Sequence, residues 1–245
     1  MSGKLTGKVA LVTGASAGIG EAVARSLAAE GASLVLTARR QERLEALASE
    51  LQNLGTGTQV WVVPGDAREE ETAQRAVETA TRSGGRLDIL INNAGAGNYK
   101  NLVDTSVAEY DDLMDTNMRS TFVFTRHAVP VMQAQGEGTV LMISSMAGLY
   151  GFAGEAVYCA TKFAQVGFAQ ALDRELRPQG IKVGVICPGG VKTEFGLGRG
   201  RTEEGVAASS MLEPEDVAGA VLLACTQSAG SRIIEIQMRT MAEAL

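Results

Sequence analysis

Residues 8–20 read Lys8-Val-Ala-Leu-Val-Thr-Gly-Ala-Ser-Ala-Gly-Ile-Gly20, and the expected architecture of the chain follows from them. The apolar run 8–13 has the length and composition of a buried strand, and residues 18–30 have the pattern of a helix. Glycines between a strand and a helix allow a tight turn and a close approach of backbone N–H groups to an anion, which the helix N-terminus also attracts. The segment therefore predicts a phosphate-binding turn that opens a βαβ unit.

Similar apolar runs recur along the chain. Strands are predicted at 33–38, 59–63, 87–92, 139–144, 181–187 and 232–237, and helices at 41–54, 69–82, 106–133 with a break near Asn117, 155–177 and from Pro214. Nearly uniform apolar strands separated by helices indicate a parallel sheet covered on both faces. We expect one α/β domain over residues 1–245, a doubly wound Rossmann fold with about seven strands. A glycine-rich segment at 194–211 is the expected substrate loop.

Composition excludes several classes of function. Of the 245 residues, 45% are hydrophobic and 20% charged, and the net charge of −6 argues against binding to nucleic acid. No apolar segment reaches the roughly 18 residues that span a bilayer. Three widely spaced cysteines match no metal-ligand pattern and favour a reducing compartment. We expect a cytoplasmic protein without a membrane segment or a metal, whose single histidine, His127, leaves acid–base chemistry to Tyr, Lys or carboxylates.

The glycine turn also fits a different class of protein. Gly14-Ala-Ser16-Ala-Gly18 matches the G-x-S-x-G turn that carries the nucleophile of serine hydrolases. That mechanism needs a histidine partner, and His127 is predicted to lie inside a helix. Only one strand precedes Ser16, whereas several normally precede such a nucleophile. The dinucleotide interpretation is therefore favoured over the hydrolase.

The end of the second predicted strand indicates which dinucleotide is bound. In NAD-binding proteins an acidic residue there accepts hydrogen bonds from the ribose 2′-hydroxyl, and arginine instead favours a 2′-phosphate. Here the strand ends Thr37-Ala-Arg39-Arg40, without a carboxylate. We therefore expect NADP(H) as the cofactor.

Tyr158 and Lys162 provide the expected acid–base chemistry. They lie four residues apart on a predicted helix and thus on one face of it. A tyrosine has a pKa near ~10, and a nearby cation lowers that value. We expect Lys162 and an oxidised nicotinamide to contribute to lowering the pKa of the Tyr158 phenol into the working range of a general acid or base.

Taken together, the motifs resemble the short-chain dehydrogenase/reductase family over nearly the whole chain. The resemblance rests on Thr13-Gly-x-x-x-Gly-x-Gly20, Asn92-Asn-Ala-Gly95, Asn117, Ser145, Tyr158-x-x-x-Lys162 and Pro188-Gly189. It implies an oxidoreductase that transfers a hydride between the nicotinamide and a carbonyl or alcohol. Members form homodimers or homotetramers through two long helices, here 106–133 and 155–177. The apolar residues Phe163, Val166, Phe168 and Leu172 fit such a contact.

The resemblance also implies roles for individual residues. Tyr158 is the general acid in reduction and the base in oxidation, Ser145 binds the substrate oxygen, Lys162 holds the ribose, and Asn117 positions a water of a proton relay. Ala17 departs from the basic residue that some NADP-using members carry. The residues expected to bind the cofactor are Gly14, Ser16, Gly18, Ile19, Gly20, Arg39, Arg40, Asp66, Ala67, Asn93, Ala94, Gly95, Tyr158, Lys162, Pro188, Gly189, Val191 and Thr193.

The substrate is expected to be a small aldehyde, ketone or 3-hydroxy acid. Reductases that act on acyl carrier proteins present basic residues near segments 133–138 and 178–180, and both lack them here. A 3-oxoacyl-thioester reductase and a non-catalytic NADP-sensing module remain as alternatives. The residues predicted to line the substrate pocket are Ser145, Met146, Tyr150, Phe152, Gly190 and Phe195.

Overall fold

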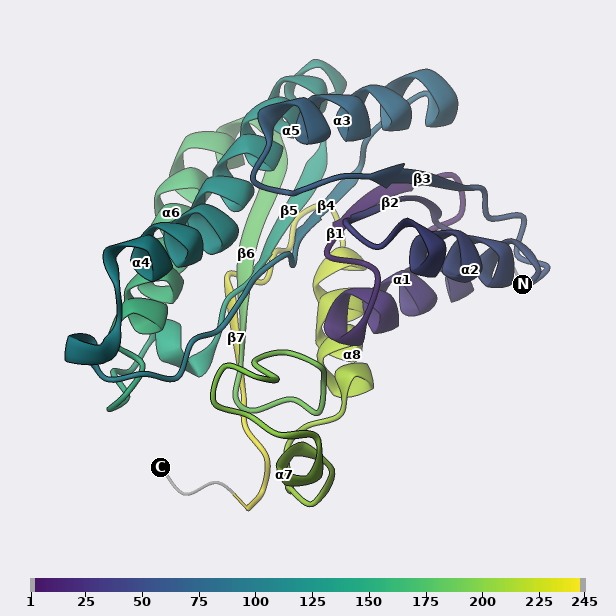
Figure 1. Cartoon of the computed structure of the whole chain (residues 1–245). Helices are drawn as coiled ribbons and strands as arrows, with labels where there is room; N and C mark the ends of the chain where they lie inside the picture. The colour runs from purple at the N-terminus through teal and green to yellow at the C-terminus, as the bar shows by residue number, and fades with distance from the viewer. Residues whose placement is uncertain (1–2, 243–245) are drawn as a thin grey trace.

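The fold is built on one sheet of seven parallel strands in the order β3-β2-β1-β4-β5-β6-β7 (Figure 1). The computed structural model describes residues 3–242. The strands are β1 (Val9–Thr13), β2 (Ser33–Ala38), β3 (Val60–Pro64), β4 (Ile89–Asn92), β5 (Gly138–Ile143), β6 (Ile181–Pro188) and β7 (Glu235–Met238). The chain runs outward from β1 to β3 and then returns to place β4 on the other side of β1. Ligands of such sheets bind at this switch point, beyond the carboxyl ends of the strands.

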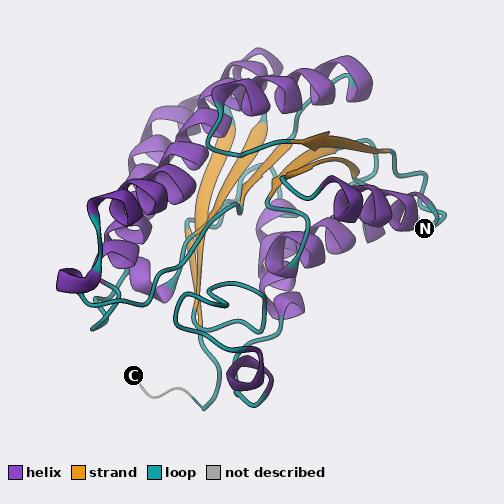
Figure 2. Ribbon diagram, viewed as in Figure 1, coloured by secondary structure: helices purple, strands orange, loops and turns teal. Residues whose placement is uncertain are grey.

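Helices cover both faces of the sheet, which confirms the predicted doubly wound fold (Figure 2). One face packs against α1, α2 and α8, and the other against α3, α5 and α6. The helices are α1 (Gly18–Ala29), α2 (Gln41–Gln52), α3 (Glu70–Gly84), α4 (Val107–Met114), α5 (Ser120–Gln135), α6 (Ala156–Leu176), α7 (Glu203–Ala207) and α8 (Pro214–Cys225).

The central strand β1 shows why the fold needs two helical layers. All five of its residues are buried. Successive side chains of a strand point to opposite faces, so Ala10 and Val12 join the core under α1, α2 and α8, and Val9 and Leu11 join the core under α3, α5 and α6. A strand that is apolar on both faces therefore requires cover on both.

The long helical segment after β4 is interrupted, as predicted, at Asn117. Helix α4 begins at a capping box in which the Ser106 hydroxyl accepts from the Glu109 N–H at 3.2 Å. A π-helical turn, Asp115–Arg119, then joins α4 to α5 and carries the fully buried Asn117. Such single turns are frequent at functional sites because they change the direction of one side chain within a helix.

The C-terminal third differs from expectation in two places. The segment 194–211 contains the short helix α7, whose first turn is capped by the Thr202 hydroxyl accepting from the Gly205 N–H at 3.1 Å. The last strand begins at Glu235, later than the predicted residue 232, and Arg232 before it pairs with the buried Asp173 at 2.6 Å. Hydrophobic periodicity reports neither a one-turn helix nor an ion pair.

The four residues expected to form the subunit contact differ in exposure. Val166 and Leu172 are buried in the core of the chain itself, where they pack beneath the sheet, and only Phe163 of the four named residues is exposed, at 47%. Further exposed apolar side chains are Leu102 and Val103, and, within the predicted helix 106–133, Val107 and Phe122. Within residues 3–242, no helix is both long enough and apolar enough to cross a membrane.

Candidate active site

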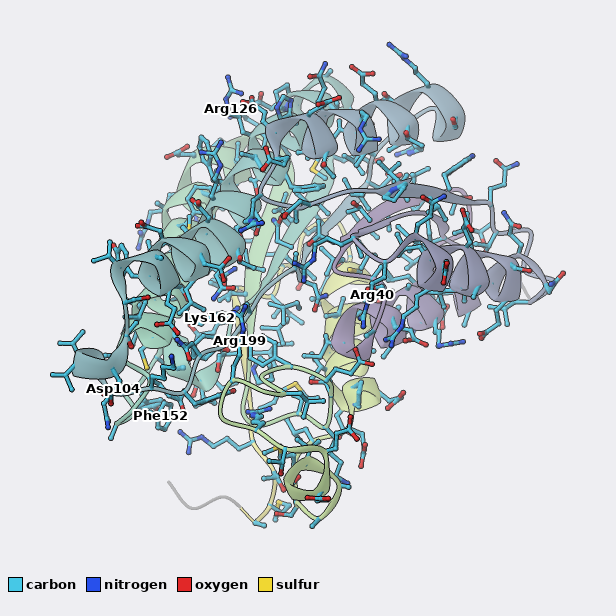
Figure 3. The ribbon with its side chains drawn as sticks, in the orientation of Figure 1. Arg40, Asp104, Arg126, Phe152, Lys162 and Arg199 are labelled. Carbon is cyan, nitrogen blue, oxygen red and sulfur yellow. The ribbon has the colours of Figure 1, made fainter. Side chains whose placement is uncertain are left out.

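A cavity of about 450 Å³ lies at the carboxyl ends of the central strands. Its walls come from the glycine turn, the ends of β2 and β4, helix α6 and the segment that follows β6. Every residue predicted to bind the cofactor lines it except Gly20. In Figure 3, Lys162 and Arg199 lie near the centre of the molecule and Arg40 lies to their right.

The glycine turn has the shape that a diphosphate requires. Gly14 and Gly18 adopt positive φ angles of 66° and 57°, a conformation in which other residues are strained. A Cβ on Gly20 would lie 2.4 Å from the Gly14 oxygen, so Gly20 is packed inside the turn, which explains why it does not line the cavity. Ala17, the cap residue of α1, offers no side-chain hydrogen bond to the first N–H groups of the helix. These donors suit an anion.

Thr13 and Asn93 hold this turn against β4. The Thr13 hydroxyl accepts from the N–H groups of Asn93 and Ala94, both at 2.9 Å. The Asn93 amide in turn donates to the Thr13 carbonyl oxygen at 2.9 Å. Sequence reasoning placed Asn93 on the cofactor and gave Thr13 no role. The structure shows both joining the ends of β1 and β4, so the cradle is braced by the chain's own hydrogen bonds.

Arginines gather at the opposite end of the cavity from Lys162. Arg39 and Arg40 both line it, and Arg40 donates to the Ser16 hydroxyl at 3.2 Å. Glu194 lies across this end, with its carboxylate 2.6 Å from Arg40 and 2.8 Å from Arg43. Hydrogen bonds from these two guanidinium groups hold the pKa of Glu194 below its usual value. Two guanidinium groups already share one anionic group here, which fits a site for phosphate.

Asp66, expected to bind the cofactor, is held in place by its own neighbour. Arg68 donates to the Asp66 carboxylate through its side chain at 2.6 Å and through its backbone N–H at 3.0 Å. The side-chain hydrogen bonds from Arg68 keep the pKa of Asp66 below its usual value. Both residues line the cavity, so Asp66 presents an ionised, oriented acceptor there.

Helix α6 brings Tyr158 and Lys162 to the same end of the cavity. Both are nearly buried, at 6% and 3% exposure, and the Lys162 Nζ lies 5.8 Å from the centre of the Tyr158 ring. Ser145 also lines this end, and its hydroxyl accepts from the Ala147 N–H at 3.1 Å. The four-residue spacing on α6 thus places Tyr158 and Lys162 at the same end of the cavity, as predicted.

The pKa of Tyr158 moves in the direction opposite to expectation. Burial raises the pKa of the phenol above its usual value, and a hydrogen bond with Ser145 opposes that effect without cancelling it. The expectation that Lys162 lowers this pKa is wrong for the chain by itself, because the desolvation of the phenol outweighs the other influences. The phenol is therefore neutral and able to donate a proton.

Lys162 and Asn117 are each committed to protein partners. The Lys162 ammonium donates to the Ile143 carbonyl oxygen at 3.0 Å and to the Gln165 side-chain oxygen at 2.9 Å, and burial lowers its pKa to about 8. The Asn117 amide pairs with the backbone of Ala96 at 2.7 and 2.9 Å. Asn117 thereby fastens the π-helical turn to the segment after β4.

Aromatic and basic residues that the sequence analysis missed surround Tyr158. Its ring packs against Phe195, as expected of a pocket residue, with ring centres 5.9 Å apart, and against Tyr99 at 6.3 Å. The Arg201 guanidinium lies 5.0 Å from the centre of the Tyr99 ring. Arg199 and Arg201 both line the cavity. The run Arg199-Gly-Arg201 in a glycine-rich loop was the available signal.

Four of the predicted pocket residues do not line this cavity. Met146 is buried in the core, because a 3-10 turn, Met146–Gly148, follows Ser145 and directs it inward. Gly190 faces Met211, whose side chain would meet a Cβ at 2.9 Å. Tyr150 and Phe152 are exposed, and Figure 3 places Phe152 toward the edge of the molecule, away from Lys162. Of the six, Ser145 and Phe195 remain in the lining.

The geometry does not assemble a serine hydrolase. The His127 ring lies 3.1 Å from the Glu70 carboxylate at the start of α3. Among residues 3–242, the partner of the Ser16 hydroxyl is Arg40. In Figure 3, Arg126, which precedes His127, lies at the top of the molecule and away from Arg40. The alternative based on Ser16 therefore lacks its base.

Comparison with known proteins gives consistent matches. The family model described as short chain dehydrogenase matches residues 8–204. An uncharacterized oxidoreductase of Staphylococcus aureus (strain USA300) is 37% identical over 235 residues, which cover 96% of this chain and 98% of the relative.

Solved structures of two kinds of oxidoreductase superpose closely. The closed form of a serine dehydrogenase complexed with NADP+ aligns with a TM-score of 0.90 at 32% identity, covering 97% of this chain and 96% of that one. A 3-ketoacyl-(acyl-carrier-protein) reductase from Brucella melitensis complexed with NADH aligns with a TM-score of 0.87 at 30% identity, covering 96% of this chain and 98% of that one.

Proposed function

The chain belongs to the short-chain dehydrogenase family of oxidoreductases, and on that premise we propose that it is an NADPH-dependent reductase of small carbonyl compounds. One observation carries the proposal. Tyr158, Ser145 and Lys162 converge at one end of a cavity whose other end presents Arg39 and Arg40. A proton donor and a site for a phosphorylated dinucleotide thus share one space.

The arginine end supports NADPH in preference to NADH. A 2′-phosphate gains charge-assisted hydrogen bonds from guanidinium groups, and no carboxylate follows β2 to receive a 2′-hydroxyl. The glycine turn and the first N–H groups of α1 would hold the diphosphate, and Lys162 the nicotinamide ribose. Bound there, the cofactor supplies the hydride.

The protein's own groups supply the proton. Tyr158, kept neutral by burial, donates its phenol proton to the oxygen of the substrate carbonyl. The Ser145 hydroxyl, fixed beside it, stabilises the charge that develops on that oxygen. Lys162 keeps a positive charge near both groups. A neutral phenol is the form that can protonate the substrate oxygen during reduction.

The loop arginines support a substrate that carries a carboxylate. Arg199 and Arg201 line the cavity, and the charge of Arg201 acts on the Tyr158 phenol. An oxo acid, whose reduction gives a hydroxy acid, would place its carboxylate against this charge. The similarity to a 3-ketoacyl reductase favours a 3-oxoacyl thioester as the second candidate.

A substrate panel followed by NADPH absorbance tests the proposal. It contains matched pairs of 3-oxo acids and their methyl esters, simple aldehydes and ketones, and a short 3-oxoacyl thioester. We expect the acids to be reduced with the highest kcat/KM, and Arg201→Met to remove that preference without slowing the esters. Higher kcat/KM for the thioester selects the second candidate. If the protein binds NADPH but oxidises it with none of these substrates, the non-catalytic sensing module is indicated instead.

A further inference from the structure

Gln165 forms a buried link between Lys162 and Asn117. It lies on α6 one turn after Lys162, and its side chain is fully buried. Its oxygen accepts from the Lys162 ammonium at 2.9 Å. Its nitrogen donates to the Asn117 carbonyl oxygen at 3.0 Å and to the Thr121 hydroxyl at 2.8 Å. This neutral polar side chain therefore uses its hydrogen bonds to connect Lys162 with Asn117 and Thr121 inside the core.

The chemistry of its partners fixes the orientation of the Gln165 amide. A carbonyl oxygen such as that of Asn117 only accepts hydrogen bonds, and an ammonium such as that of Lys162 only donates them. A flipped amide would place its NH2 group against the ammonium and its oxygen against the carbonyl oxygen. Both contacts would be repulsive, so the amide oxygen must face Lys162.

Gln165 also determines what remains free on Lys162. An ammonium has three N–H donors, and two of them are used by the Ile143 carbonyl and Gln165. Lys162 lines the cavity. The two protein acceptors behind it therefore leave the third donor for whatever the cavity binds.

Burial lowers the pKa of Lys162 to about 8. Hydrogen bonds to acceptors favour the charged form of such a group, and the acceptors of Lys162 are the Ile143 carbonyl and Gln165. The titratable groups that face it are Tyr158 on α6, whose ring centre lies 5.8 Å away, and Cys187 on β6. Burial raises the pKa of the Tyr158 phenol and that of the Cys187 thiol, the latter to about 12. Both are neutral near pH 7, and within residues 3–242 no carboxylate contributes to the pKa of Lys162.

Gln165 also contacts the backbone of Asn117, the residue that the family resemblance expects to position a water of a proton relay. The Asn117 carbonyl oxygen accepts from the Thr121 hydroxyl at 2.8 Å as well as from Gln165. A carbonyl oxygen has two lone pairs, and both are engaged. The Gln165 side chain therefore links Asn117 to Lys162 directly.

We propose that Gln165 is a positioning residue that keeps Lys162 charged and directs its third N–H into the cavity. The inference rests on the proposed function, in which Lys162 holds the cofactor ribose and supplies charge beside Tyr158. It identifies the acceptor that Lys162 needs when no carboxylate is near.

Two substitutions of similar size should move the titration of Lys162 in opposite directions. Gln165→Met removes the acceptor, and a hydrogen bond to a charged group favours the charged form, so the midpoint should fall by about one pH unit. Gln165→Glu places a carboxylate beside the ammonium, so the midpoint should rise by about one unit or more. Gln170→Met, on an exposed position of the same helix, should leave it unchanged.

The measurement is a 13C NMR titration of labelled lysine in the chain without cofactor. The Lys162 resonance is identified by its absence in Lys162→Met. Circular dichroism checks that each variant is folded. If Gln165→Met does not fold, Thr121→Val serves in its place, because it removes a hydrogen bond of the Gln165 amide without contacting Lys162. The titration midpoint of Lys162 should then fall by a smaller amount.

Activity gives the second measurement. In Gln165→Met the alkaline limb of the kcat/KM profile should move to lower pH together with the NMR midpoint. An unchanged midpoint in Gln165→Met, or shifts of the same sign in the Met and Glu variants, overturns the role of Gln165 whatever the enzyme reduces. If the Met and Glu variants shift the midpoint in opposite directions but the protein reduces no carbonyl compound, the role of Gln165 is supported and the proposed reaction is overturned.

Discussion

The two ends of the cavity are built in different ways. At the catalytic end, Tyr158 and Lys162 are almost completely buried, and Lys162 is held by hydrogen bonds within the core. At the arginine end, Arg40 and Glu194 form an ion pair in which the side chains are 44% and 49% exposed. The first end has a fixed geometry before any ligand binds, and the second is closed by a contact that a ligand can replace.

The energetic consequence follows from the difference in exposure. Exposed ion pairs contribute only about 0.2–1 kcal/mol, because water and salt screen them. Hydrogen bonds to charged groups contribute roughly 1.5–3 kcal/mol, and more is lost when a buried partner is left without one. The cavity thus combines a rigid site for chemistry with an anion site whose resident carboxylate, Glu194, is easily displaced.

Removal of the phenol should have the largest effect and should affect one end only. Tyr158→Phe keeps the packing against Phe195 and removes the proton donor, so kcat should fall by about 10³-fold. NADPH affinity, measured by fluorescence titration, should stay within about twofold, since the arginine end is untouched. Near-normal turnover in this variant contradicts the assignment of Tyr158.

Removal of a guanidinium should affect the other end. Arg39→Met and Arg40→Met should each weaken NADPH binding by about 10- to 100-fold, the value of a charge-assisted hydrogen bond. NADH binding should change little, because it has no 2′-phosphate.

Arg43→Met is the matched control for these variants. Arg43 also pairs with Glu194, but it does not line the cavity. If all three variants weaken NADPH and NADH binding equally, the arginine end does not select the cofactor.

A pH titration should act on the catalytic end. The pKa of Lys162 is lowered to about 8, so the charged form is complete below that pH and is lost as the pH rises through it. The kcat/KM for NADPH, which reports the free enzyme, should therefore fall above pH 8, by about tenfold per unit. A profile that stays flat to pH 10 would show that the charge of Lys162 is not needed.

The smallest effect is expected at Glu194, and it should be a gain. Glu194→Gln removes the carboxylate that competes with a phosphate for Arg40, so NADPH should bind about two- to fivefold more tightly at low salt. High salt should reduce this difference, because exposed charges are screened. Isothermal titration at two salt concentrations checks both points, and weaker binding in the variant would mean that Glu194 contacts the cofactor.

Local patterns were sufficient for most of the fold. Strand β2 lies where it was predicted, β1 begins one residue later than predicted, and β3 is shifted by one residue at both ends. The break at Asn117 was also expected. Gly14 and Gly18 of the cofactor turn line the same cavity as Tyr158 and Lys162, as predicted. These predictions succeeded because strand and helix periodicity, and the spacing of four residues on a helix, depend only on residues that are close together in the sequence.

One error is local: Met146 was assigned to the pocket and is in the core, because a 3-10 turn follows Ser145. The omissions concern partners that are distant in the sequence, such as Glu194, which lies 154 residues from Arg40, with which it pairs. Gln165 reads locally as one more polar residue of a helix, and its role is visible only once Asn117, 48 residues away, lies beside it.

Periodicity and motif spacing thus established the doubly wound sheet, the phosphate turn and the tyrosine–lysine pair, since short-range geometry dictates all three. The neutral state of Tyr158, the lowered pKa of Lys162 and the acceptor on Gln165 were settled only when the chain folded. Burial and hydrogen bonding depend on which elements pack together, and that packing changes the protonation of a side chain without changing its identity.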